Sequence, residues 1–129
     1  MSMNAKILLV EDNAANRYLA TFLLEKAGYI VRHASNGEEA IRSAQSERPD
    51  LVLMDLQMPG MDGFEAAQRI RLIPKSGDVV MVALSSHTTE ANRQKAIASG
   101  FNGYLEKPIV TGTFTNEIAN FLSGKAGAP

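Results

Sequence analysis

Short apolar runs alternate with amphipathic helical patterns along this 129-residue chain, and this alternation constrains the fold more than any other feature. Three runs, at 7–10, 51–54 and 79–84, are apolar throughout and show no polar alternation. Such runs are typical of strands that helices cover on both faces of a parallel sheet. Two weaker candidates, at 29–33 and 103–106, contain polar residues and are expected at the sheet edges. The sequence therefore predicts five strands.

A helical pattern follows each predicted strand, so the sequence also predicts five helices. Residues that can cap a helix N-terminus open the first three patterns: Asn13, Asn36 and Asp62. Thr88 or Thr89 opens the fourth pattern, and the fifth begins at about Thr113. The first helix is expected to bury a stripe of Ala15, Leu19, Phe22 and Leu23, and the fourth a thin face of Ala91, Ala96 and Ile97. Strict alternation of strands and helices predicts right-handed crossovers and an α/β fold with a doubly wound parallel sheet.

The composition excludes several classes of protein. Apolar residues make up 45% of the chain and charged residues 21%, which argues against a disordered or low-complexity chain. A net charge of −1 provides no basic surface for nucleic acid or for an anionic membrane. The absence of cysteine excludes disulfides and thiolate chemistry, and no apolar run approaches the length of a membrane span. We expect a cytoplasmic protein with one domain over 1–122 and a flexible tail over 123–129.

Polar residues that could take part in catalysis or metal binding follow four of the five predicted strands. Glu11 and Asp12 follow the first, Asp55 the third, Ser85 the fourth and Lys107 the fifth. The carboxyl ends of parallel strands meet at one edge of a sheet, where functional groups gather. We therefore expect three carboxylates, a hydroxyl and an ammonium group at this edge.

This set of groups suits phosphoryl chemistry. Three adjacent carboxylates repel one another unless a cation is present, and Mg²⁺ prefers oxygen ligands. An aspartate can act as a nucleophile toward phosphorus, so Asp55, which directly follows a buried strand, is the candidate phosphoacceptor. Lys107 would neutralise charge on the transferring group, and Ser85 would donate a hydrogen bond.

Four segments in register resemble the receiver domain of two-component response regulators, including single-domain receivers such as CheY and DivK. The resemblance covers 6–122 and rests on LLVEDN at 8–13, DLQMPGMDG at 55–63, VALSS at 82–86 and YLEKP at 104–108. It implies a flavodoxin-like fold with strand order 2-1-3-4-5. It also implies a phosphorelay switch that accepts a phosphoryl group from a histidine kinase or a histidine phosphotransfer protein.

The resemblance assigns a role to each candidate residue. Asp55 would be phosphorylated, Lys107 would pair with the phosphoryl group, and the bond between Lys107 and Pro108 would be cis. The Mg²⁺ ligands would be Glu11, Asp12, Asp55 and the backbone carbonyl of Gln57. Ser85 would be the switch hydroxyl, in place of the more usual threonine, and Tyr104 would follow it inward. The fourth helix, fifth strand and fifth helix would then present the signal to a downstream protein.

The sequence also admits alternative functions. The chain ends soon after the fifth helix, so output is expected through protein contacts, either as a free-standing regulator or as the receiver part of a hybrid histidine kinase. An interaction module without phosphorylation is disfavoured because the acids and Lys107 are all present. An aspartyl-phosphate hydrolase is disfavoured because Gln57 stands where such enzymes place a second acid. We expect self-phosphorylation and autodephosphorylation but no other enzymatic activity.

Other residues near these motifs are expected to have structural roles or no role. Asp62 is explained by its capping role, Gly60 and Gly63 by the turn, and His33 is expected to be solvated and without function. Gln57 and His87 are expected to flank the path of water to an acyl phosphate, and so to influence its hydrolysis.

Overall fold

Ten elements alternate along the chain in the computed structural model, which describes residues 4–58, 60–86 and 88–124. Their order is β1 (Lys6–Val10), α1 (Ala14–Lys26), β2 (Ile30–Ala34), α2 (Gly37–Ser46), β3 (Leu51–Asp55), α3 (Gly63–Arg71), β4 (Val80–Ser85), α4 (Glu90–Ala98), β5 (Gly103–Glu106) and α5 (Phe114–Leu122). Each predicted strand and helix is present, with strand bounds that differ by at most one residue from those expected.

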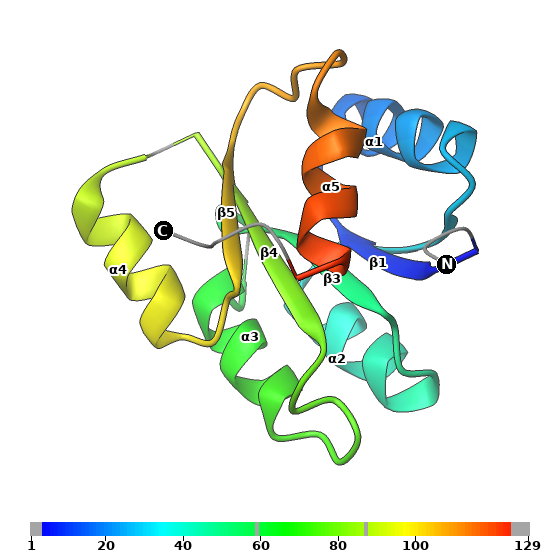
Figure 1. Ribbon diagram of the computed structural model, residues 1–129. Coiled ribbons are helices and arrows are strands. Elements are labelled where there is room, and N and C mark those ends of the chain that lie inside the picture. The colour runs from blue at the N-terminus through cyan, green and yellow to red at the C-terminus, as the bar shows by residue number, and fades with distance from the viewer. Residues whose placement is uncertain (1–3, 59, 87, 125–129) are drawn as a thin grey trace.

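The strands form one parallel sheet in the order β2-β1-β3-β4-β5 (Figure 1). The three strands predicted from unbroken apolar runs, β1, β3 and β4, are the central ones, and the weaker candidates β2 and β5 lie at the edges. The order and the doubly wound connections confirm the flavodoxin-like fold. They also bring the carboxyl ends of β1 and β3 side by side.

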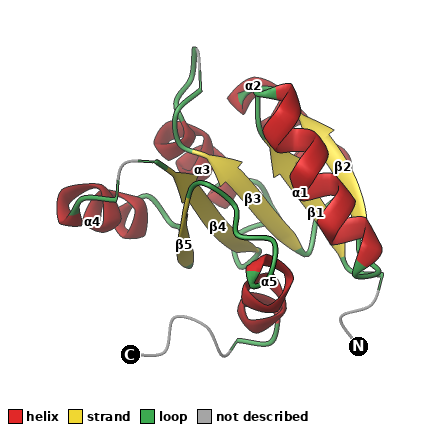
Figure 2. Cartoon of the chain, turned by 90° about the horizontal axis from the view of Figure 1, so that it is seen from above, coloured by secondary structure: helices red, strands yellow, loops and turns green. Residues whose placement is uncertain are grey.

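Helices cover both faces of the sheet (Figures 1 and 2). One core contains residues of α1 and α5, including Leu24 and Ile118, and the other contains residues of α2, α3 and α4, including Ala40 and Ile70. Within the part of the chain that the structure describes, no helix combines the length and apolar character needed to cross a bilayer.

Side-chain caps begin four of the five helices, and three of these caps, Asn13, Asn36 and Asp62, were predicted from the sequence. The side chains of Asn13, Asn36, Asp62 and Thr89 each accept a hydrogen bond from the backbone N–H three residues later. Thr89 rather than Thr88 caps α4. Thr113 precedes α5 but makes no side-chain capping bond.

Two predicted helix faces were partly wrong. In α1, Ala15 and Phe22 are exposed, and the buried residues are Ala20 and Leu24. Apolar residues occur on more than one side of this helix, so their spacing alone did not fix which side faces the sheet. In α4, Ala96 is buried as expected, whereas Ala91 and Ile97 are exposed.

Gly63 allows α3 to begin directly against the end of β3. A Cβ atom at this position would lie 2.9 Å from the backbone oxygen of Asp55 and 3.0 Å from Cα of Leu56. Both are backbone atoms at the candidate phosphoacceptor or next to it. The Gly63 N–H also donates to the oxygen of Leu56 at 3.4 Å. The glycine predicted to serve the turn therefore also serves close packing beside Asp55.

Gly63→Ala is expected to lower the free energy of unfolding by about 1–3 kcal/mol, because backbone atoms must shift to admit the methyl group. Urea unfolding monitored by circular dichroism measures the change. Gly112→Ala is the matched control, since a Cβ there meets no heavy atom within 4 Å. Equal stabilities of the two variants would contradict the packing role of Gly63.

Candidate functional site

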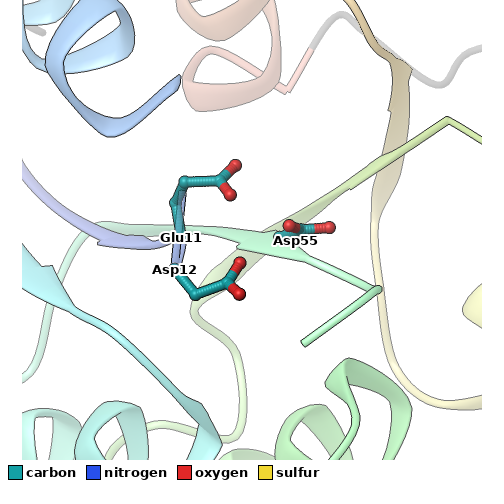
Figure 3. Close-up of side chains that lie close together, drawn as sticks. All are labelled: Glu11, Asp12 and Asp55. Atoms are coloured by element: carbon teal, nitrogen blue, oxygen red, sulfur yellow. The ribbon is translucent and has the colours of Figure 1, made fainter. Parts of the chain in front are cut away.

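Three carboxylates gather at the carboxyl edge of the sheet, as predicted (Figure 3). Glu11 and Asp12 follow β1 directly, and Asp55 is the last residue of β3. One carboxylate oxygen from each residue lies within 4.8 Å of the others. Glu11 and Asp55 are only 1% and 2% exposed, whereas Asp12 is exposed, so the cluster opens to solvent on the side of Asp12.

Glu11 is held in an environment that disfavours its charge. Its Oε2 accepts a hydrogen bond of 3.2 Å from the Asn13 N–H, and its backbone oxygen accepts one of 2.9 Å from Arg17 of α1. Its Oε1 accepts no hydrogen bond from any residue that the structure describes. Burial, followed by the negative charge of Asp55, raises the pKa of Glu11 to about 7.

Lys107 supplies the cation of the site. Its Nζ donates to Asp55 Oδ2 at 2.8 Å and lies 3.2 Å from Glu11 Oε1. Burial by itself lowers the pKa of this ammonium, but the hydrogen bond and charge of Asp55, together with Glu11, outweigh it and raise the pKa above its usual value. The peptide bond between Lys107 and Pro108 is cis, as the resemblance implied.

The site is suited to a hard divalent cation. One amine faces two buried carboxylates while a third carboxylate stands at the opening, so the site has an excess of negative oxygen donors. Glu11 Oε1 is buried, and its charged neighbour is the Lys107 ammonium at 3.2 Å, which Asp55 shares. Oxygen ligands of this kind, supplemented by water, are those that Mg²⁺ prefers.

Ser85 and Gln57 meet beside Asp55. Ser85 is fully buried at the end of β4, and its Oγ accepts a hydrogen bond of 3.0 Å from Gln57 Nε2. The Gln57 backbone N–H donates to Asp55 Oδ1 at 3.0 Å. The position of Gln57, two residues after Asp55, predicted its place near the site, but nothing in the sequence predicted that its side chain would bond to Ser85.

Tyr104 lies on β5, half-buried against the core between the sheet and α4. The guanidinium of Arg93, from α4, stands 5.6 Å from the centre of its ring. Arg93, Ala96, Ile97, Phe121 and residues 101–104 line a cavity of about 250 Å³ between α4, β5 and α5. The resemblance singled out Tyr104, but no sequence pattern predicted its contact with Arg93.

The remaining residues considered from sequence lie apart from the carboxylates or outside the described residues. Asp62 caps α3 by accepting from the Glu65 N–H, in agreement with its structural interpretation. His33 is exposed, and its Nε2 lies 2.8 Å from Thr21 Oγ1. His87, expected to flank the path of water, lies outside the residues that the structure describes.

The sequence profile of the response regulator receiver domain matches residues 7–119. The chain therefore belongs to the family of response regulator receiver domains. Receiver domains are signalling switches of two-component systems rather than enzymes in the usual sense, and they bind Mg²⁺ at an acidic site. They interact with histidine kinases or phosphotransfer proteins.

Individual relatives agree with this assignment. The chain is 32% identical over 120 residues to Protein PilH of Pseudomonas aeruginosa, covering 93% of this chain and 99% of PilH. It is 44% identical to a segment of hybrid signal transduction histidine kinase B of Dictyostelium discoideum, covering 82% of this chain but 6% of that protein. Both single-domain receivers and receiver parts of hybrid kinases are thus among its relatives.

Solved structures show the same fold. The chemotaxis response regulator CheY4 of Vibrio cholerae aligns with a TM-score of 0.87 and 32% identity, over 91% of this chain and 98% of CheY4. The receiver domain of the sensor histidine kinase PA1611 of Pseudomonas aeruginosa aligns with a TM-score of 0.86 and 32% identity, over 93% of this chain and 98% of that domain. That receiver domain has a magnesium ion coordinated in its active site cleft.

Proposed function

We propose that this chain is a phosphorelay switch that takes a phosphoryl group onto Asp55 from a phosphorylated histidine of a kinase or phosphotransfer protein, in the cytoplasm. The observation that carries the proposal is the contact of Asp55 with Lys107 at 2.8 Å within a cluster of three carboxylates. An oxygen of Asp55 would attack phosphorus, an O–P bond would form as the N–P bond breaks, and the electron pair would return to the imidazole nitrogen of the donor.

Asp55, Lys107 and Ser85 would have different roles in this transfer. Asp55 lies at the end of a central strand, where the Gln57 N–H and Lys107 fix both of its carboxylate oxygens. Lys107 carries the positive charge that offsets the charge of the incoming phosphoryl oxygens. Ser85 provides a hydroxyl at the end of the neighbouring strand. Asp55 and Lys107 are positioned before a donor arrives, and such positioning is the main requirement of phosphoryl transfer.

Mg²⁺ would be held by Glu11, Asp12, Asp55 and the backbone carbonyl of Gln57. When bound, such an ion supplies charge neutralisation to phosphoryl oxygens and orients them. The excess of acidic oxygens over the single ammonium of Lys107 supports this ligand set. Asp12, the exposed acid, stands where an entering ion first meets the site.

Output would pass through the surface formed by α4, β5 and α5. A phosphoryl group on Asp55 would draw the Ser85 hydroxyl toward it and allow Tyr104 to move inward. Ala96 is the one buried residue of α4, and the ring of Tyr104 already lies at the edge of the core. An element with so few apolar contacts can change position at low cost in free energy. A downstream protein would recognise the rearranged surface.

Incubation with acetyl phosphate and Mg²⁺, followed by intact-mass spectrometry, tests the proposal. A labile adduct of one phosphoryl group per chain is the expected result, with self-phosphorylation and autodephosphorylation as the only chemistry. Many turnovers of acetyl phosphate per chain would indicate a hydrolase instead. Absence of any adduct would indicate an interaction module that works without phosphorylation.

Mg²⁺ is expected to stabilise the folded protein, by about 2.7 kcal/mol when the free ion is at roughly 100 times its Kd. Asp12→Asn should reduce this stabilisation strongly, because it removes one anionic ligand without changing the size of the side chain. Urea unfolding with and without Mg²⁺ measures both effects. Asp62→Asn is the matched control, since asparagine caps helices as well as aspartate does. Equal Mg²⁺ effects in the two variants would exclude Asp12 as a ligand.

A further inference from the structure

The side-chain amide of Gln57 joins the loop after β3 to the end of β4. Its Nε2 donates to Ser85 Oγ at 3.0 Å, and its Oε1 accepts a longer bond of 3.5 Å from the Ser86 N–H. Its own backbone N–H donates to Asp55 Oδ1 at 3.0 Å. One residue therefore contacts both the candidate phosphoacceptor and the candidate switch hydroxyl.

The direction of the bond to Ser85 follows from chemistry. A backbone N–H can only donate, so the Ser86 N–H requires the oxygen of the Gln57 amide to face it. The amide nitrogen then faces Ser85, and because an amide nitrogen can only donate, the serine oxygen must accept. The bond draws the Ser85 oxygen toward the loop after β3 and gives it a defined orientation.

Serine needs such a restraint more than threonine does. Threonine has two heavy atoms on Cβ, which limit its rotamers, whereas the serine hydroxyl can occupy all three staggered positions. Ser85 is fully buried, while Gln57 is exposed. The amide thus lies over the hydroxyl from the solvent side and can move away without disturbing the core.

We propose that Gln57 is a positioning residue that holds the Ser85 hydroxyl in the unphosphorylated arrangement, so that a phosphoryl group on Asp55 must compete with the Gln57 amide for Ser85. The proposal rests on the function proposed above and adds a regulatory element to the same site. The hydrogen bond of Gln57 lowers the affinity for a phosphoryl group, because it must break before Ser85 can turn.

The affinity for beryllofluoride, a phosphoryl mimic that does not hydrolyse, tests this role in the presence of Mg²⁺. Gln57→Met keeps the length of the side chain and removes both polar atoms, and it should raise the affinity by roughly threefold to tenfold, the range expected for one hydrogen bond. Gln68→Met makes the same chemical change on the exposed side of α3 and should leave the affinity at the wild-type value.

A double-mutant cycle shows whether the effect passes through Ser85. In a Ser85→Ala background, Gln57→Met should no longer raise the affinity, because the hydroxyl is absent from both members of the pair. A rise that persists without the hydroxyl would overturn the proposal. Equal affinity of wild type and Gln57→Met would also overturn it, even where Gln57→Met changes the hydrolysis rate of a real acyl phosphate.

The same binding experiment distinguishes a failure of the proposed phosphorelay function from a failure of the proposed role of Gln57. If wild-type protein with Mg²⁺ binds no beryllofluoride, the proposed phosphorelay function fails, and the role of Gln57 fails with it. If wild type binds and Gln57→Met binds equally well, the function stands and the role of Gln57 alone is refuted.

Discussion

Asp55→Asn is expected to abolish phosphoryl uptake from acetyl phosphate and from a phosphorylated histidine protein alike. An amide oxygen is a poor nucleophile, so no O–P bond forms at this position. The shape of the side chain is unchanged, and the Gln57 N–H can still donate to the remaining oxygen. Intact-mass spectrometry after incubation with each donor measures the loss. The expected spectrum shows the unmodified chain alone.

Asp62→Asn is the control for this experiment, because Asp62 is close in sequence but is occupied in capping α3. It should take up one phosphoryl group per chain, as wild type does. Uptake by Asp55→Asn at the wild-type level would mean that another residue is the acceptor. In that case the role assigned to the carboxylate cluster would be wrong.

Lys107→Met is expected to slow phosphoryl uptake from acetyl phosphate by roughly 10²–10³-fold, the size of effect found when one stabilising group is removed from a transition state. Methionine keeps most of the length of the stem but carries no charge. It leaves the buried carboxylates of Glu11 and Asp55 without the ammonium that lies 3.2 Å and 2.8 Å from them. The rate of adduct formation, followed by intact mass at a saturating Mg²⁺ concentration, measures the effect.

Lys107→Arg should not restore the rate, although it keeps the charge. The planar guanidinium is wider than an ammonium and holds its donors in a rigid fork, so it does not reproduce the compact charge that Lys107 places between the two carboxylates. Lys6→Met is the matched control, because Lys6 lies at the opposite end of β1 and pairs with Glu47 on the surface. A Lys107→Met rate equal to that of Lys6→Met would show that Lys107 does not act in the transfer.

The fold could be predicted from the sequence because its signals are local and agree with one another. Unbroken apolar runs marked the central strands, and Asn13, Asn36 and Asp62 marked the helix starts at which they are found. The buried faces of α1 and α4 were harder to predict. Phe22 and Ile97 are apolar but lie on the exposed sides of their helices, whereas Ala20 and Ala96 are buried.

The site could be predicted to the level of which residues meet. Glu11, Asp12, Asp55 and Lys107 each end or follow a strand of one parallel sheet, so topology alone brings them together. What sequence could not give is the set of specific hydrogen bonds. The bond from Gln57 to Ser85 depends on the path of a loop and on a side-chain rotamer, and neither leaves a pattern in the sequence.

Reduction of the phosphorylated wild-type protein with borohydride, followed by peptide sequencing by mass spectrometry, tests the central claim most directly. Borohydride converts an aspartyl phosphate to homoserine, so the modified position is read from the peptide mass. We expect homoserine in place of Asp55 and intact residues at Asp12 and Asp62. Homoserine at either of the other positions, with Asp55 unchanged, would contradict the account.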